Sequence, residues 1–120
     1  MIQKRLKSFV YAFRGIATLV KTQPNAKIHL FATICVIGLA VFLNVTLTEW
    51  AILALAIGSV WAAEALNTAI EFLADKTSPD WHELIEKTKD VAAAGVLLAA
   101  ITALAVGLLI FLPYIFKLWR

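Results

Sequence analysis

Apolar residues dominate three stretches of this chain, each long enough to cross a bilayer, which takes about 20 helical residues. The first and third contain no charged residue, and the second carries acidic groups. The more polar segment 75–90 separates the last two, and within it Ser78 and Pro79 suit the N-cap and first turn of a helix. We therefore expect three transmembrane helices, over residues 28–47, 50–74 and 91–112.

The segment 2–22, ahead of the first span, has a different pattern. Apolar side chains recur at steps of three and four residues, and basic side chains recur with Tyr11 on another face. An apolar face beside a basic face is typical of a helix that lies in the plane of the lipid headgroups. The simpler role for such a helix is a plain membrane anchor. The apolar face comprises Ile2, Leu6, Phe9, Phe13, Ile16 and Val20, and the basic face Lys4, Lys7 and Arg14.

The composition agrees with an integral membrane protein of one domain, residues 1–120. Of the residues, 62% are hydrophobic and 16% charged, and the mean hydropathy is +0.85. A soluble domain of this size cannot bury so much apolar surface. The composition thus excludes a secreted disulfide scaffold, a disordered tail and an ordinary soluble enzyme. The single cysteine, Cys35, lies in an apolar run and cannot form an internal disulfide.

Basic residues are distributed unequally around the spans. Nine of the eleven Lys and Arg residues precede the first span or lie in 75–90, whereas Lys117 and Arg120 follow the third. The positive-inside rule therefore places the N-terminus and the 75–90 loop of this multi-pass protein in the cytoplasm. The net charge of +3 has the same explanation, since the basic residues lie beside apolar spans. It indicates a membrane surface rather than nucleic acid.

Two ridges of small residues run along the second and third spans. Such ridges let helix backbones approach closely, either within one subunit or between subunits. Because three helices shield little polar content from lipid, we expect an oligomer. The ridges comprise Ala54, Gly58 and Ala62 in the second span, and Gly95, Ala99, Ala103 and Gly107 in the third.

Polar side chains line one face of the second span, at intervals of three and four residues. We call this set the polar stripe: Glu64, Asn67, Thr68, Glu71 and Asp75. An acid at the bilayer centre costs about 2.5–3.5 kcal/mol, so intramembrane acids are usually functional. A neutral, hydrogen-bonded glutamic acid that joins helices is the structural alternative.

The polar stripe suits phosphoryl transfer to a lipid hydroxyl. Glu64, inside the membrane, is a candidate proton acceptor. Glu71 and Asp75 lie nearer the surface, and with Asp90 and Gln23 they could hold Mg²⁺, a cation that prefers oxygen ligands.

Three basic residues offer positive charge to the phosphates of a nucleotide: Lys89, Lys4 and Arg14. The chain has neither a Walker A loop nor a Gly-x-Gly-x-x-Gly motif. Any nucleotide site must therefore be built from helices.

Several motifs along nearly the whole chain resemble the prokaryotic diacylglycerol kinase family. The most specific is Glu64-Ala-Leu-Asn67-Thr68-Ala69-Ile70-Glu71, and the others are Tyr11-Ala-Phe-Arg14-Gly15-Ile16, Asn25-x-x-Ile28-His29-Leu30, Asp75, His82 and Lys89-Asp90-Val91-Ala92-Ala93. The resemblance implies a homotrimer with three transmembrane helices and an amphipathic surface helix per subunit. It also implies Mg²⁺, ATP as donor, and phosphorylation of diacylglycerol to phosphatidic acid or of undecaprenol to its monophosphate.

Residue roles follow from the same resemblance. Glu64 is implied as general base, with Asn67 supporting the reacting groups. Glu71 is implied as a metal ligand, with Gln23 where the family usually has a second metal-binding glutamate. The implied ATP-binding residues are Lys4, Tyr11, Gln23, Glu71, Asp80, Trp81, His82, Lys89 and Asp90, and the implied lipid-binding residues are Arg14, Glu64 and Asp75.

Other interpretations fit some of these features. A helix start exposed to solvent explains Asp80, Trp81 and His82 equally well. A small proton-coupled transporter could use Glu64, but such transporters have four spans with the acid in the first. A catalytically silent member of the kinase fold is favoured only by Gln23.

Overall fold

The computed structural model describes all residues 1–120 and contains four α-helices and no strand. The predicted all-helical fold is confirmed. Helices α2, α3 and α4 are each long and apolar enough to cross a membrane, which is consistent with an integral membrane protein. The helices are α1 (Ile2–Thr22), α2 (Pro24–Leu43), α3 (Leu47–Thr77) and α4 (Glu83–Leu118).

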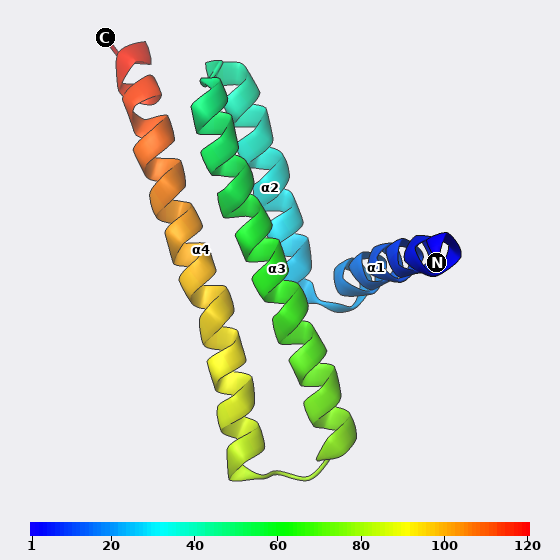
Figure 1. Ribbon diagram of the computed structural model, residues 1–120. Helices are drawn as coiled ribbons and strands as arrows, with labels where there is room; N and C mark the ends of the chain where they lie inside the picture. Colours follow the sequence, from blue (N-terminus) through cyan, green and yellow to red (C-terminus); the bar gives the residue numbers. More distant parts are fainter.

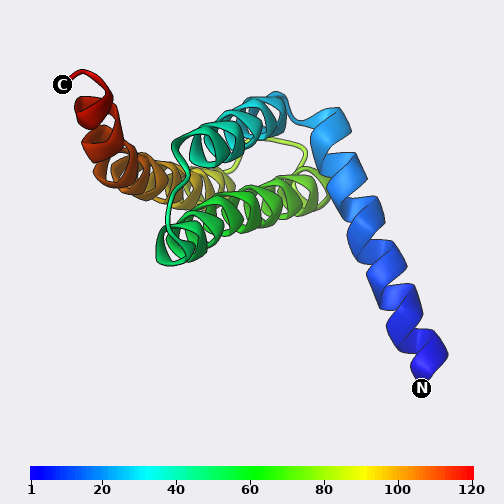
Figure 2. The ribbon, with the colours of Figure 1, turned by 90° about the horizontal axis from the view of Figure 1, so that it is seen from above.

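Helices α3 and α4 form a long antiparallel hairpin, and α2 lies beside the first half of α3 (Figure 1). Helix α1 runs across the other three rather than along them, and its N-terminus points away from the bundle (Figure 2). The two chain reversals are at opposite ends of the bundle, at residues 44–46 and 78–82. The chain thus forms three roughly parallel or antiparallel rods with one helix set across them.

Helix α1 contacts α3 near the middle of that helix. A shallow pocket of ≈ 410 Å³ lies between Gly15, Ile16 and Leu19 of α1 and the α3 segment from Ala65 to Phe72. Beyond Phe72, α3 continues to Thr77, which adds roughly 8 Å of helix at 1.5 Å per residue. The α3–α4 end of the hairpin therefore projects past the level of α1.

The first apolar helix ends at Leu43, four residues before the predicted end of the first span. Asn44 adopts a left-handed conformation with φ 54°, which terminates α2. Thr46 then begins α3 with a capping box: its Oγ1 accepts from the Glu49 N–H, and Glu49 Oε1 accepts from the Thr46 N–H. Because the side chains of Thr46 and Glu49 accept hydrogen bonds from each other's backbone N–H groups, a new helix begins here and α2 is not prolonged.

The last helix begins at Glu83, and the predicted start at Ser78 and Pro79 is wrong. The Ser78 N–H donates to the Ala74 carbonyl at 2.9 Å, so Ser78 ends α3. His82 is the N-cap, and its Nδ1 accepts from the Leu84 N–H at 3.1 Å. Ser78 does not cap α4 because it is the C-cap of α3, and its hydroxyl donates to the Asp80 carbonyl within the loop.

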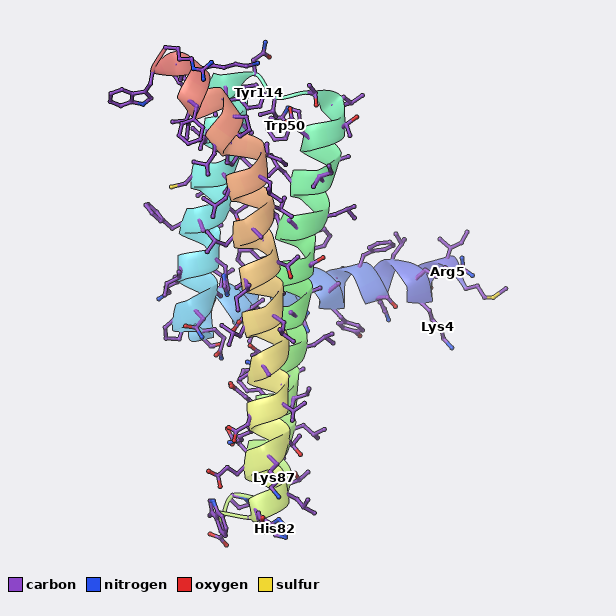
Figure 3. All side chains as sticks on the ribbon, turned by 90° about the vertical axis from the view of Figure 1, so that its left-hand side faces the viewer. Lys4, Arg5, Trp50, His82, Lys87 and Tyr114 are labelled. Atoms are coloured by element: carbon purple, nitrogen blue, oxygen red, sulfur yellow. The ribbon has the colours of Figure 1, made fainter.

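The buried apolar cluster lies toward the end of the bundle that holds the 44–46 reversal. There Tyr114 donates a hydrogen bond to the Glu49 carboxylate, beside Trp50 (Figure 3). Over the whole chain only 12 of 120 residues are buried. Most apolar side chains therefore need lipid or another subunit to cover them. The buried apolar cluster comprises Ala40, Val45, Leu53, Ile110 and Phe111.

The small-residue ridges are not filled by close helix packing at their glycines. A Cβ added at Gly58, Gly95 or Gly107 would meet no neighbouring atom within 4 Å. Packing inside one subunit therefore does not require glycine at these positions. Ala99 and Ala103 of the ridge line a pocket between α3 and α4 of the same chain, and contact between subunits stays a prediction.

Candidate active site

Glu64 lies at the centre of the molecule, where three helices meet. It is 1% exposed and is the one large side chain that is fully buried. Its neighbours Asn67 and Thr68 on α3 are also buried. We call the space beside it the Glu64 cavity; its volume is ≈ 270 Å³, and it is lined by Asn25, Ile28, His29, Glu64, Asn67, Ala93, Val96, Leu97 and Ala100.

Several polar atoms around this cavity have no hydrogen-bond partner. They are His29 Nε2, Glu64 Oε2 and Asn67 Oδ1. Thr68 Oγ1 is also unpartnered, but Thr68 lines the pocket between α1 and α3. His29 Nε2 of α2 lies 3.6 Å from Glu64 Oε2 of α3. Leaving a buried polar group unpaired costs about 1–3 kcal/mol. Glu64 therefore has a polar neighbour on α2 but no hydrogen bond to it, and such unpaired polar atoms suit the binding of a polar group.

The polar stripe becomes more exposed toward the 78–82 loop. Asn67 Nδ2 donates to Glu71 Oε1 at 3.4 Å, and Glu71 is half-buried. One helical turn further on, the exposed Asp75 accepts a hydrogen bond from Lys89 of α4. The structure thus forms one continuous set of polar side chains that leads from the buried cavity to the surface. We call this set the polar strip: Glu64, Asn67, Glu71 and Asp75 of the polar stripe, together with Lys89 of α4.

The other predicted ATP-site residues of the hairpin lie at its exposed end. Asp80, Trp81 and His82 occupy the loop between α3 and α4, and Asp90 is exposed on α4. Trp81 Nε1 donates to Glu86 at 2.8 Å, and His82 caps the helix. Their contacts are therefore local, as a helix start would require.

The predicted site residues of α1 are not brought to the hairpin within one chain. Lys4, Tyr11 and Arg14 are exposed, and the Arg14 guanidinium lies 5.6 Å from the centre of the Tyr11 ring. Lys4 lies toward the free end of α1, well away from the loop that carries His82 (Figure 3). A ligand that touches both must draw on more than this single subunit, or on a moved α1.

Gln23 is the link between α1 and α2. Its backbone is extended, and its half-buried side chain donates to Thr22 Oγ1 at 3.2 Å. Glu71 accepts from Asn67, and no hydrogen bond joins it to Gln23. No group of three His, Cys, Asp or Glu side chains gathers closely enough to hold a metal ion on its own.

The sequence analysis assigned no role to a polar network on the other side of Glu64. Trp61 Nε1 donates to Thr33 Oγ1 at 3.0 Å, and the Thr33 hydroxyl donates to the His29 carbonyl at 2.7 Å. The rings of His29 and Trp61 meet edge to face, with their centres 6.3 Å apart. Two signals were available: His29 lies in the motif Asn25-x-x-Ile28-His29-Leu30, and Trp61 precedes Glu64 by three residues, as His29 precedes Thr33 by four.

An apolar groove of ≈ 400 Å³ continues from the Glu64 cavity between α2 and α4. The two spaces share His29 and Ala100. The apolar groove is lined mainly by aliphatic side chains such as Val36 and Leu104, and it reaches Phe111 in the buried cluster. A hydrocarbon chain in this groove would place a polar head beside Glu64.

Comparison with known proteins identifies relatives over most of the chain. The family model described as prokaryotic diacylglycerol kinase matches residues 10–111. An undecaprenol kinase of Bacillus subtilis is 38% identical over 112 residues, which cover 93% of this chain and 91% of the relative. A diacylglycerol kinase of Synechocystis is 42% identical over 114 residues, 94% of this chain but 65% of that relative. A diacylglycerol kinase of Escherichia coli strain K12 is 28% identical over 98 residues, 82% of this chain and 80% of the relative.

Proposed function

The chain belongs to the prokaryotic diacylglycerol kinase family, and from this we propose that it is a lipid kinase that transfers the γ-phosphoryl group of ATP to a membrane lipid alcohol. The relatives are named for two such substrates, diacylglycerol and undecaprenol. The observation that carries the proposal is the buried, unpaired carboxylate of Glu64 at the junction of a polar strip and an apolar groove. This junction suits a substrate with a hydrocarbon tail and a reactive hydroxyl.

In the proposed reaction Glu64 is the general base. The lipid hydroxyl donates its proton to the Glu64 carboxylate while its oxygen forms a bond to the γ-phosphorus. The bond between that phosphorus and the β–γ bridging oxygen breaks, so ADP leaves with the bonding electrons. Asn67, one turn along α3, orients the reacting groups with its side-chain amide.

The polar strip also fits a magnesium ion held jointly with the phosphates of ATP. Mg²⁺ is usually bound through one or two carboxylates plus substrate phosphates, so a complete protein cage is not needed. Glu71 would supply the carboxylate, and the unpartnered Asn67 Oδ1 and the Gln23 amide would supply neutral oxygens. When bound, the ion neutralises negative charge that builds up on the transferring phosphoryl group.

We assign the exposed end of the hairpin to the nucleotide. Lys89 and Asp90, with Asp75 and the loop from Asp80 to His82, lie where the polar stripe reaches the surface. Lys4 and Tyr11 would complete the ATP site, and Arg14 would bind the lipid headgroup. Because these α1 residues lie apart from the hairpin within one chain, we infer that they come from a neighbouring subunit of a homotrimer.

The proposed membrane placement follows from charge. Helix α1 would lie in the headgroup plane of the inner membrane, with its basic face toward the cytoplasm. The projection of the α3–α4 end past the level of α1 then carries the nucleotide-binding residues into the cytoplasm. The whole chain, 1–120, would act as one membrane-embedded lipid-kinase domain.

Direct phosphorylation tests this function. Purified protein should label diacylglycerol or undecaprenol in vesicles that contain the lipid alcohol, γ-labelled ATP and Mg²⁺. Vesicles without a lipid alcohol should give no labelled product. Glu64→Gln protein in the same vesicles is the matched control. If neither lipid is labelled, the silent-member alternative is favoured. Proton-driven substrate flux without labelling would favour the transporter.

A further inference from the structure

His29 is a half-buried side chain that approaches Glu64 from a different helix. It projects from α2, with its Nε2 3.6 Å from Glu64 Oε2, and neither atom has a hydrogen-bond partner. A normal N–H···O hydrogen bond needs a separation of about 2.7–3.2 Å. A movement of a few tenths of an ångström therefore converts two unpaired buried atoms into one hydrogen bond.

Contacts with Trp61 and Thr33 restrict the orientation of the His29 imidazole ring. Trp61 packs its ring edge to face against that ring. Trp61 is fixed in turn by its hydrogen bond to Thr33, whose hydroxyl bonds back to the His29 carbonyl. This closed set of contacts joins α2 to α3 and directs Nε2 toward Glu64.

We propose that His29 is a positioning residue for the general base. Its neutral imidazole, with the proton on Nε2, donates a hydrogen bond to Glu64 Oε2 and fixes the rotamer of the carboxylate. The other carboxylate oxygen, Oε1, is then free to receive the proton of the lipid hydroxyl. The inference rests on the proposed role of Glu64, and it adds that the base is oriented from α2.

The position of His29 supports this role over simple packing. An apolar side chain would fill the same space at the border of the Glu64 cavity and the apolar groove, without leaving a buried nitrogen unpaired. Misplacement of a catalytic group by 1 Å can cost about 100-fold in rate. The loss of the positioning contact should therefore lower turnover without weakening substrate binding.

Two amide substitutions at position 29 test whether the side chain must place an N–H group within hydrogen-bond distance of Glu64 or need only be polar. His29→Gln places an amide N–H near the position of the imidazole Nε2–H, whereas the shorter side chain of His29→Asn does not reach Glu64. We expect His29→Asn to lower kcat about 10- to 100-fold, with KM for MgATP and for the lipid alcohol unchanged within about twofold. His29→Gln should stay within about threefold of the parent kcat. His29→Leu, which has no donor, should behave as His29→Asn does.

Thr102→Val is the control for a polar-to-apolar change inside a candidate span. Its hydroxyl bonds only to the Leu98 carbonyl of its own helix, away from the site. This variant should keep the parent kcat, and equal melting temperatures in detergent should show that the compared proteins are folded. The inference is overturned if folded His29→Asn and His29→Leu keep the parent kcat, if His29→Gln falls as far as they do, or if the loss is in KM.

The variant Glu64→Gln distinguishes failure of this inference from failure of the proposed function. If His29 acts through Glu64, the pair Glu64→Gln and His29→Asn should be no slower than Glu64→Gln alone. An additive further loss would overturn the inference. If Glu64→Gln keeps the parent activity, the proposed role of Glu64 as general base is rejected. If Glu64→Gln is inactive and His29→Asn is fully active, only the role of His29 is rejected.

Discussion

Glu64 combines complete burial with the absence of any hydrogen bond, and this combination determines what its substitution should do. Glu64→Gln preserves the volume of the side chain but removes the proton acceptor. We expect kcat to fall about 10²- to 10⁴-fold, the usual contribution of a general base, while MgATP still binds. Initial rates of lipid phosphorylation and nucleotide binding by equilibrium dialysis check this. Activity within about threefold of the parent would contradict the assignment.

Glu71 is half-buried beside the unpartnered amide oxygen of Asn67, so its substitution should act through the metal. Glu71→Gln removes the one full negative charge of the proposed ligand set. The Mg²⁺ concentration needed for half-maximal rate should rise, because hard divalent cations bind carboxylate better than amide oxygen. An unchanged magnesium titration at saturating ATP would show that Glu71 is not a ligand.

Gln23 tests whether the α1–α2 link belongs to the same ion site. If it does, Gln23→Glu adds a carboxylate and should lower the magnesium requirement. Combining it with Glu71→Gln should then cancel much of the gain, because both ligands share one ion. The contact with Thr22 allows the competing interpretation that Gln23 only links two helices. In that case the added charge is screened within about 10 Å at 0.1 M salt, and the two substitutions act independently.

The polar stripe could be predicted from spacing alone, because residues three and four apart share a helix face whatever surrounds the helix. That His29 points toward Glu64 could not be predicted from spacing. It depends on how α2 is rotated about its own axis, and an almost wholly apolar helix gives no periodic signal for that rotation. Residue contacts within α3 were therefore open to sequence reasoning, whereas contacts between α2 and α3 were not.

At the scale of helices, the capping box fixes where α3 begins. Thr46→Ala removes the hydroxyl that accepts from the Glu49 N–H, and we expect it to destabilise the fold by about 1 kcal/mol. The melting temperature in detergent should fall, with kcat unchanged because the box lies at the end of the bundle away from the 78–82 loop. Ser59→Ala, whose hydroxyl bonds only within α3, is the control and should melt as the parent does. Equal melting of the two variants would contradict the role of the cap.

Helix ends were predicted less well than helix interiors. Long apolar runs exceed what a loop can hold, so the existence of three spans follows from composition. The end of a helix depends instead on a few local bonds that compete. The left-handed Asn44 stopped α2 before the apolar run ended, and the Ser78 N–H bonded to α3 rather than opening α4.

At the scale of the whole molecule, the polar strip on the hairpin and the basic face of α1 are separate in one subunit. Lys4 extends away from the loop of His82, and few residues are buried overall. The glycines of the small-residue ridges meet no neighbour within the chain. Each of these features is accounted for if subunits associate and an α1 helix reaches the hairpin next to it.

Mixed oligomers test this sharing of sites. Arg14→Ala should inactivate the α1 contribution and Glu64→Gln the base, so each variant alone should be nearly inactive. If each site takes α1 from one subunit and Glu64 from its neighbour, subunits refolded together in equal amounts should form about a quarter of their sites from two intact contributions, since closed symmetric oligomers draw their subunits at random. The mixture should thus regain about a quarter of the parent rate. Refolding each variant separately before mixing is the control. A co-refolded mixture that stays as inactive as its parts would mean that each subunit builds its own site, and α1 would then have to swing toward the hairpin to bring Arg14 to the lipid headgroup.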